Sequence, residues 1–274
     1  MPPAADAKVR TPRAAAAADQ GTVHRVTRLL TSVVDHPNES AGALAVRVGL
    51  PRSTTHRLLA LLRDGGFVDD GVDGGYTAGA ELFRLAGRLI ADVPYQRLAQ
   101  PLLQALTARF DETALLTLLA RGPLKMFYGA AAAPADPMRY DMELNRLESL
   151  AWGATGRSLL AWLDDAEIDA VVARNEPAPV GGRPLEPAEL IRSLRAIRSD
   201  GYAMTHSHRT RQAIGIAVPF FAADGEVVGN VALLVPSFRF DEARLPAIVE
   251  ALRDGADRMS RVLGHEGGAS RSRV

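Results

Sequence analysis

Residues 39–68, ESAGALAVRVGLPRSTTHRLLALLRDGGFV, decide the fold of the N-terminal part of the chain. Asn38-Glu39-Ser40 can cap a helix whose apolar residues recur at three- and four-residue spacing, and Gly49 can end that helix. Leu50-Pro51 restarts the chain, because proline is tolerated at the first position of a helix. A second apolar face follows and closes at Gly65-Gly66. Two helices joined by so short a turn have the spacing of a helix-turn-helix motif.

The flanking segments complete this unit. Residues 23–34 place apolar side chains on one face, which predicts a preceding helix that ends before Pro37. Two short strand-like runs enclose the acidic, glycine-rich turn DDGVDGG and predict a two-stranded wing. Residues 81–90 again show helical spacing, over a segment too short to form a domain. We therefore expect a winged helix-turn-helix at residues 21–78 and a linker helix at 79–94.

The second helix of the motif carries a locally basic face. Four arginines and no acidic residue lie from Arg47 to Arg63, although 32 basic and 32 acidic side chains balance over the whole chain. In a helix-turn-helix this helix enters the major groove of DNA, where basic and hydroxyl side chains suit phosphates and arginine can pair with guanine. We expect Arg52, Ser53 and Thr54 to contact the DNA backbone, and His56 and Arg57 to contact bases. The predicted DNA-binding residues are Arg47, Arg52, Ser53, Thr54, His56 and Arg57.

The sequence leaves an alternative open, and one feature of the wing disfavours DNA contact. A small trihelical domain with a solvated basic face is also compatible with a protein-binding module. The wing carries Asp69, Asp70 and Asp73, which would repel phosphates. We therefore expect little insertion of the wing into a groove.

A second domain is expected at residues 95–264. Its pattern begins with a helix at 96–110, followed by the apolar runs TALLTLLA and KMFYGAAAA. Helices are predicted at 155–163, 166–173, 187–199 and 241–263, and the stretches AIGIAVPFF and EVVGNVALLV flank a hairpin turn. Antiparallel strands with helices packed on one side predict an α+β sensor domain. Residues 1–20 are predicted to form a disordered tail and residues 265–274 a flexible one.

Five segments in the same order resemble the IclR family of bacterial regulators: LAVRVGLPRSTTHRLLALLRDGGFV, YTAG, LAWGATGRSLLAWL, IRSDGYAMTH and AIGIAVPFFAADGEVVGNVALLVPSFRF. The resemblance spans residues 22–263 and implies a winged helix-turn-helix, a linker helix and a C-terminal α/β domain similar to GAF-type sensors. It also implies a homodimer or homotetramer that binds a palindromic operator in double-stranded DNA. We expect a repressor controlled by a small-molecule effector, with a transcriptional activator of the same family as the alternative.

The resemblance implies an effector pocket in the C-terminal domain. Family positions and their surroundings give ten residues, namely Met138, Met142, Trp152, Ala154, Thr155, Thr205, Ala213, Gly215, Ala232 and Leu234. The segment after Gly-Tyr-Ala often carries acidic residues in the family, whereas residues 205–209 here read THSHR. This departure predicts an aromatic or apolar effector, with a carboxylate held by Arg209 or Arg211. The two methionines are equally compatible with core packing.

Other chemistry finds little support in the sequence. The chain has no cysteine, so disulfides and thiolate zinc sites are excluded. His206 and His208 would face the same way on a strand, but a metal site needs a third ligand, such as Asp141 or Glu143. Ser158 lacks the G-x-S-x-G turn of a hydrolase nucleophile. We expect no enzyme activity, cofactor or metal; the alternative of another class is a small-molecule-processing enzyme with an accessory helical module.

Composition agrees with a two-domain globular protein of 274 residues. Hydrophobic residues make up 47% of the chain and charged residues 23%, which excludes wholesale disorder. The N-terminal segment lacks the apolar core of a signal peptide, and no stretch approaches the roughly 18 apolar residues of a membrane span. We therefore expect a cytoplasmic protein with no membrane partner.

Overall fold

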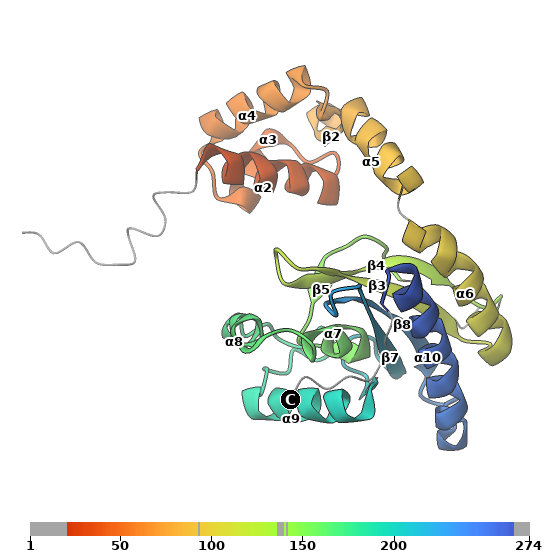
Figure 1. The fold of residues 1–274 in the computed structure, drawn as a ribbon. Helices are drawn as coiled ribbons and strands as arrows, with labels where there is room; N and C mark the ends of the chain where they lie inside the picture. The colour runs from red at the N-terminus through yellow and green to blue at the C-terminus, as the bar shows by residue number, and fades with distance from the viewer. Residues whose placement is uncertain (1–20, 93, 136–139, 141, 266–274) are drawn as a thin grey trace, which may run out of the picture. The chain divides into compact units, whose positions relative to one another are not determined.

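The structure is a computed structural model that describes residues 21–92, 94–135, 140 and 142–265 (Figure 1). The chain divides into two compact units, Met1–Asp92 and Val93–Val274. Most of the two predicted tails, the predicted pocket residue Met138 and the suggested metal ligand Asp141 lie outside the described residues.

The N-terminal unit contains the predicted helices and wing. Its elements are α2 (Thr22–Asp35), α3 (Ala41–Val48), α4 (Arg52–Asp64), β1 (Val68–Asp70), the short 3-10 helix η1 (Val72–Gly74), β2 (Tyr76–Ala78) and α5 (Ala80–Asp92). Strands β1 and β2 pair antiparallel. The apolar faces of α2, α3 and α4 close one core with the start of β1, formed by Leu29, Val33, Ala41, Leu44, Val48, Leu58, Leu59, Leu62 and Val68.

Local chemistry explains the turn between α3 and α4. Ser40 Oγ accepts a hydrogen bond from the Ala43 N–H at 3.3 Å, which caps α3. Gly49 ends α3 with φ of 66°, a left-handed conformation that glycine adopts without a steric penalty. The sequence predicts Pro51 as the first residue of α4, whereas in the structure it is the N-cap that precedes the helix. Its carbonyl accepts the first helical hydrogen bond of α4, from the Thr55 N–H.

The wing is held against the segment that precedes α3. Asn38 donates its backbone N–H to the Tyr76 carbonyl at 2.8 Å, and its side-chain Oδ1 accepts from the Val72 N–H at 2.9 Å. A Cβ atom at Gly75 would lie 2.1 Å from the Asn38 carbonyl oxygen, so only glycine fits there. These contacts fix the turn between β1 and β2.

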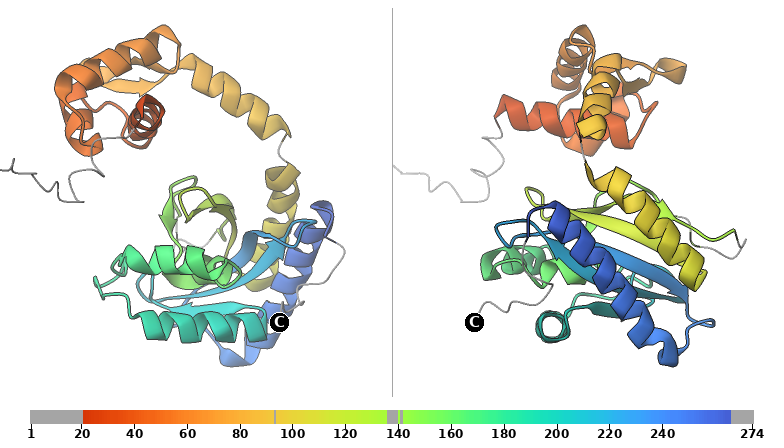
Figure 2. Two further views of the ribbon diagram at one scale, coloured as in Figure 1. Left: turned by 60° about the vertical axis from the view of Figure 1, so that its left-hand side comes forward. Right: turned by 45° about the vertical axis from the view of Figure 1, so that its right-hand side comes forward.

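The C-terminal unit is built around one six-stranded sheet (Figures 1 and 2). The strand order is β5-β4-β3-β8-β7-β6, and all neighbouring strands pair antiparallel. The strands are β3 (Thr113–Ala120), β4 (Lys125–Ala132), β5 (Glu148–Ser149), β6 (Ala203–His206), β7 (Ala213–Phe221) and β8 (Val227–Pro236). The chain therefore forms one antiparallel group before the central helices and another after them, joined where β3 meets β8.

Helices cover both faces of this sheet, so the prediction that they pack on one side is wrong. Helices α6 (Pro94–Phe110) and α10 (Leu245–Val262), the second preceded by η2 (Glu242–Arg244), lie on one face. Helices α7 (Gly153–Leu160), α8 (Asp165–Ala173) and α9 (Pro187–Asp200) lie on the other. The reason is visible in β7, where Ile216 and Val218 face the first pair of helices and Ala217 faces the second group. A strand that is apolar on both faces must be covered on both.

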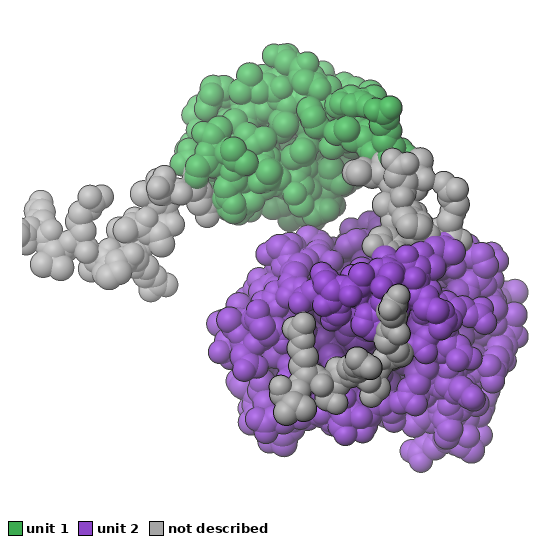
Figure 3. All heavy atoms as spheres, viewed as in Figure 1, with its two compact units in different colours: residues 1–92 green, residues 93–274 purple. Residues whose placement is uncertain are grey.

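Each unit closes a hydrophobic core of its own, and Figure 3 distinguishes the two by colour. Within the described residues, no helix is both long enough and apolar enough to span a membrane.

Candidate functional site

Helix α4 presents most of the predicted DNA-binding residues to solvent. Arg52, Ser53, His56 and Arg57 are exposed, and Thr54 is half-buried. Thr55 is buried in the core, with its Oγ1 donating to the Pro51 carbonyl at 3.2 Å. Among the described residues, neither Arg52 nor Arg57 forms an ion pair. The N-terminal half of α4 therefore offers two arginines whose charge is not neutralised by a neighbour.

The other two arginines of the basic face have carboxylate partners. Arg47 binds Glu39, with Nε 3.1 Å from Oε2, and this hydrogen bond lowers the pKa of Glu39. Arg63 Nη1 lies 2.9 Å from Asp70 Oδ1 and so connects the last turn of α4 to the wing. The locally basic surface is therefore narrower than the sequence suggests, and the negative charge of Asp70 is partly neutralised. The DNA-contacting roles of all six residues stay predictions.

A small cavity of about 30 Å³ lies on the α7 face of the sheet in the C-terminal unit. Eight of the ten predicted pocket residues line it: Met142, Ala154, Thr155, Thr205, Ala213, Gly215, Ala232 and Leu234. They come from the start of α7 and from strands β6, β7 and β8, with Met142 between β4 and β5. Sequence reasoning missed several further lining residues, including Leu115, Tyr128, Gly153 and Thr210, because their approach depends on strand register and loop path. Binding of an effector by these residues stays a prediction.

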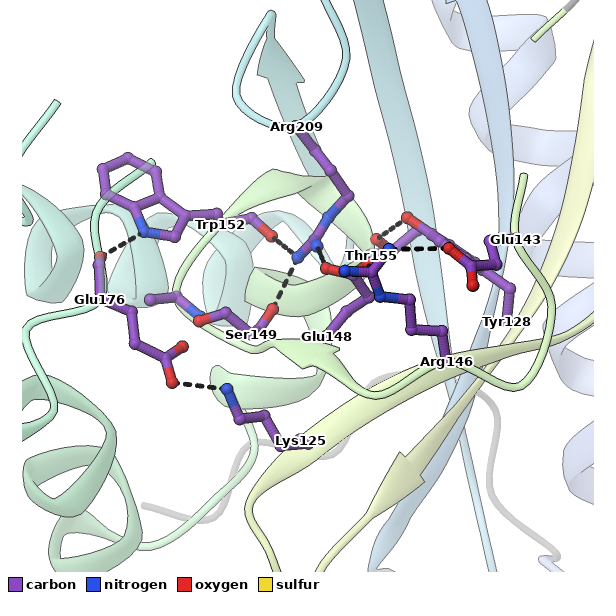
Figure 4. A network of polar contacts seen from close by, with 11 residues as sticks. Lys125, Tyr128, Glu143, Arg146, Glu148, Ser149, Trp152, Thr155, Glu176 and Arg209 are labelled. Carbon is purple, nitrogen blue, oxygen red and sulfur yellow. Dashed lines mark hydrogen bonds and ion pairs between the residues drawn. The ribbon is translucent and has the colours of Figure 1, made fainter. Parts of the chain in front are cut away.

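Trp152 does not line this cavity, in contrast to the sequence prediction. Its side chain is buried, and its Nε1 donates to the Glu176 carbonyl at 2.8 Å (Figure 4). The guanidinium carbons of Arg157 and Arg183 lie 5.7 and 5.4 Å from the centre of its ring. The indole lies beside His208 of the cavity wall, whose ring centre is 5.6 Å away. The hydrogen bond from the indole N–H to Glu176 therefore holds the ring in the core between the sheet and helices α7, α8 and α9.

Arg209 lines the cavity and joins its own loop to β5 and to the start of α7 (Figure 4). Its Nη1 lies 2.6 Å from Glu148 Oε2, and its Nη2 donates to the carbonyls of Ser149 and Trp152 at 2.6 and 2.8 Å. Gly153 has φ of 77°, and a Cβ atom there would lie 3.3 Å from Arg209 Nε. Glycine therefore lets the arginine reach the start of α7. Arg211, the other predicted carboxylate-binding residue, is not among the residues that line the cavity.

The two histidines do not share a strand face as predicted. Strand β6 ends at His206, and Ser207 then adopts φ of 52°, which turns the chain. His206 is exposed, whereas His208 is half-buried and lines the cavity. Burial lowers the pKa of His208 to about 4, assisted by the positive charges of Arg157 and Arg183, so its imidazole is neutral near pH 7. The described residues contain no cluster of three side chains able to hold a metal ion.

Buried hydroxyl and amide groups join the start of α7 to the sheet beside the cavity. Tyr128 OH lies 3.5 Å from Thr155 Oγ1, and burial raises the pKa of the tyrosine. Asn230 on β8 donates its Nδ2 to the Thr155 carbonyl at 2.7 Å and to Ser158 Oγ at 2.9 Å. Ser158 Oγ in turn donates to the Thr155 carbonyl. Ser158 therefore connects α7 to the sheet, which gives this serine a structural role.

Comparison with known proteins agrees with this architecture. The model of the bacterial IclR transcriptional regulator C-terminal domain matches residues 89–261, and that of the IclR helix-turn-helix domain matches residues 22–70. The HTH-type transcriptional regulator KipR of Bacillus subtilis is 27% identical over 246 residues, which cover 89% of this chain and 97% of KipR. The regulator KdgR of Escherichia coli is 26% identical over 246 residues, covering 89% of this chain and 93% of KdgR.

Solved structures show the same fold. An IclR transcriptional regulator from Silicibacter sp. TM1040 superposes with a TM-score of 0.84 at 24% identity, over 92% of this chain and all of that one. An IclR homologue from Microbacterium hydrocarbonoxydans, in complex with 4-hydroxybenzoate, has a TM-score of 0.71 at 24% identity, over 89% of this chain and 99% of that one. Since the two family models together match most of the chain, this protein belongs to the IclR family of transcriptional regulators, with an N-terminal helix-turn-helix DNA-binding domain.

Proposed function

We propose that this protein is a repressor that binds a palindromic operator through helix α4 and is released by a small molecule held in the cavity of the C-terminal unit. The observation that carries the proposal is the exposed start of α4, where Arg52 and Arg57 have no carboxylate partner among the described residues. Backbone N–H groups at a helix start attract phosphates, and a neighbouring guanidinium adds charge. The alternative is that the protein activates transcription instead of repressing it.

Assembly of two or four copies is part of this proposal. A helix-turn-helix dimer reads two half-sites one helical turn of DNA apart, so a palindromic operator requires two α4 helices related by symmetry. We propose a homodimer or homotetramer in the cytoplasm. The stoichiometry of the complex with operator DNA, measured by light scattering, distinguishes a dimer from a tetramer.

The size of the cavity supports control of DNA binding by a ligand. Ligand pockets usually measure about 300–1,000 Å³, whereas this cavity measures about 30 Å³. A ligand larger than a few atoms must therefore move the wall around Ala154, Thr205 or Arg209. A ligand that binds only the enlarged arrangement shifts the population toward it, which is the physical requirement for effector control. The complex of the Microbacterium homologue with 4-hydroxybenzoate supports a small organic effector.

An operator selected from random DNA with the purified protein provides the test. Small molecules are then screened for release of that operator, followed by fluorescence anisotropy. Ala154→Leu fills the cavity and should keep operator affinity within about threefold while abolishing release. Ala173→Leu, at the end of α8 and exposed, is the matched control and should respond like the wild type. Undiminished release from the Ala154→Leu variant would contradict effector control through this cavity.

A further inference from the structure

Two buried polar atoms on the cavity wall have no hydrogen-bond partner among the described residues. They are Nδ1 of His208 and Nε of Arg209. The two residues follow each other in the loop between β6 and β7. Both residues line the cavity. Buried polar atoms in folded proteins are nearly always hydrogen-bonded, so such atoms beside a cavity indicate a place for a ligand or an ordered water. Both atoms are buried in this arrangement, so a molecule in the cavity can bond to them once the wall moves, as the small volume of the cavity requires.

The charge of Arg209 is already balanced. Its side chain is only 11% exposed, and Glu148 lies at 2.6 Å. Figure 4 shows this ion pair beside the hydroxyl groups of Tyr128 and Thr155. A carboxylate that approached Arg209 from the cavity would face the Glu148 carboxylate across one guanidinium group. Two carboxylates that share a poorly solvated site disfavour each other's ionised form, so a second anion is repelled.

We infer that Glu148 makes the cavity selective for uncharged ligands, which present a carbonyl, amide or hydroxyl oxygen to Arg209 Nε and a second polar group to His208. The inference rests on the proposed function, because it names the chemical class of the effector. Small apolar side chains complete the site, and they favour a compact hydrocarbon body: Leu115, Ala154, Ala213, Ala232 and Leu234.

The remaining ionisable groups agree with a neutral ligand. The lowered pKa of His208 keeps its imidazole uncharged near pH 7, so it can donate or accept a hydrogen bond but supplies no positive charge. Burial raises the pKa of Tyr128, which keeps its phenol protonated. No charge on these two side chains compensates a bound anion.

Amide and carboxylate pairs of equal shape test the inference. The probes are acetamide with acetate, isobutyramide with isobutyrate, and benzamide with benzoate, titrated into the full chain by calorimetry. Tryptophan fluorescence provides a second readout, because Trp152 contacts His208. In the wild type we expect at least one amide to bind about tenfold more tightly than its carboxylate partner. In Glu148→Gln, carboxylate affinity should rise about tenfold or more, while amide affinity changes by less than about threefold.

Glu250→Gln is the matched control, because Glu250 is exposed on α10, which covers the other face of the sheet. This variant loses the same charge and should keep the wild-type preference. Carboxylates that bind the wild type as tightly as the amides, a preference unchanged by Glu148→Gln, or no binding of any pair by either protein would each overturn the inference. A carboxylate that releases the operator would overturn the inference and leave the proposed function standing. An amide that binds without changing operator affinity would support the inference and contradict the proposed effector control.

Discussion

The guanidinium group of Arg47, in the last turn of helix α3, is bound by the carboxylate of Glu39, which precedes that helix, with Nε 3.1 Å from Oε2. Both side chains belong to the helix-turn-helix region. Glu39 therefore neutralises one positive charge of the predicted DNA-binding surface. A carboxylate partner competes with phosphate for the charge of an arginine. Glu39 is therefore expected to limit the affinity of this domain for DNA.

Replacement of Glu39 by glutamine should strengthen DNA binding. The variant frees Arg47 for a phosphate, so operator affinity should rise about threefold to tenfold at low salt, and the slope of log affinity against log salt should steepen by up to about 0.9. Fluorescence anisotropy over a series of salt concentrations measures both. Glu81→Gln, which breaks the comparable Glu81–Arg84 pair on α5, serves as the control. An unchanged slope in the Glu39 variant would show that Arg47 does not contact DNA.

The polar contacts of Asn230 should stabilise the C-terminal unit. Asn230 is fully buried and hydrogen-bonds to the carbonyl of Thr155 and the hydroxyl of Ser158, so Asn230→Ala should lower the free energy of unfolding by about 2–3 kcal/mol. Both tryptophans, Trp152 and Trp162, lie in this unit, so urea unfolding followed by tryptophan fluorescence reports on it alone.

Thr117, the neighbour of Asn230 in the sheet, has a buried hydroxyl group that forms no such hydrogen bond within the part of the chain that the structure describes. It lies opposite Asn230 on β3, is fully buried, and its Oγ1 has no partner among the described residues. Thr117→Val removes this hydroxyl without changing the shape of the side chain, so it should be neutral or stabilising. If Asn230→Ala and Thr117→Val destabilise the unit equally, then packing rather than hydrogen bonding explains both.

Acid should destabilise the C-terminal unit partly through His208. Its pKa is about 4 in the folded state against 6.5 for an unperturbed histidine, so the unfolded chain binds the proton first. The free energy of unfolding therefore keeps its full value with respect to His208 above pH 6.5 and decreases as the pH falls toward 4. Between these limits the wild type should lose roughly 1–2 kcal/mol more than His208→Gln, allowing for partial exposure. His206→Gln, at an exposed position, should follow the wild type; equal pH slopes for all three proteins would exclude this role.

Local pattern predicts the elements of this protein well. The spacing of Leu44, Val48, Leu58 and Leu62 is sufficient to place α3 and α4, and the acidic glycine-rich turn is sufficient to place the wing. These successes depend on contacts within an element or between paired strands. The predicted pocket residues, in contrast, follow from the resemblance to the IclR family, and eight of them line one cavity because strand alternation and the start of α7 bring them to one face.

Features that depend on distant contacts could not be predicted in this way. Nothing in the spacing of Trp152 indicates that the Glu176 carbonyl accepts its N–H and draws the ring away from the cavity. The left-handed conformation of Ser207, which separates the two histidines, has no glycine to indicate it. The Glu148 partner of Arg209 lies 61 residues away along the chain, so the sequence shows the arginine but not its neutralised charge.

We expect the exposed start of α4 to bind the operator. A comparison of Arg52→Ala/Arg57→Ala with Arg192→Ala/Arg195→Ala, which removes the same charge from the exposed surface of α9, tests this expectation. Operator affinity at fixed salt should fall by about a hundredfold in the first variant and stay within about twofold of the wild type in the second. Equal affinities of the two variants for the operator would contradict operator binding by the start of α4.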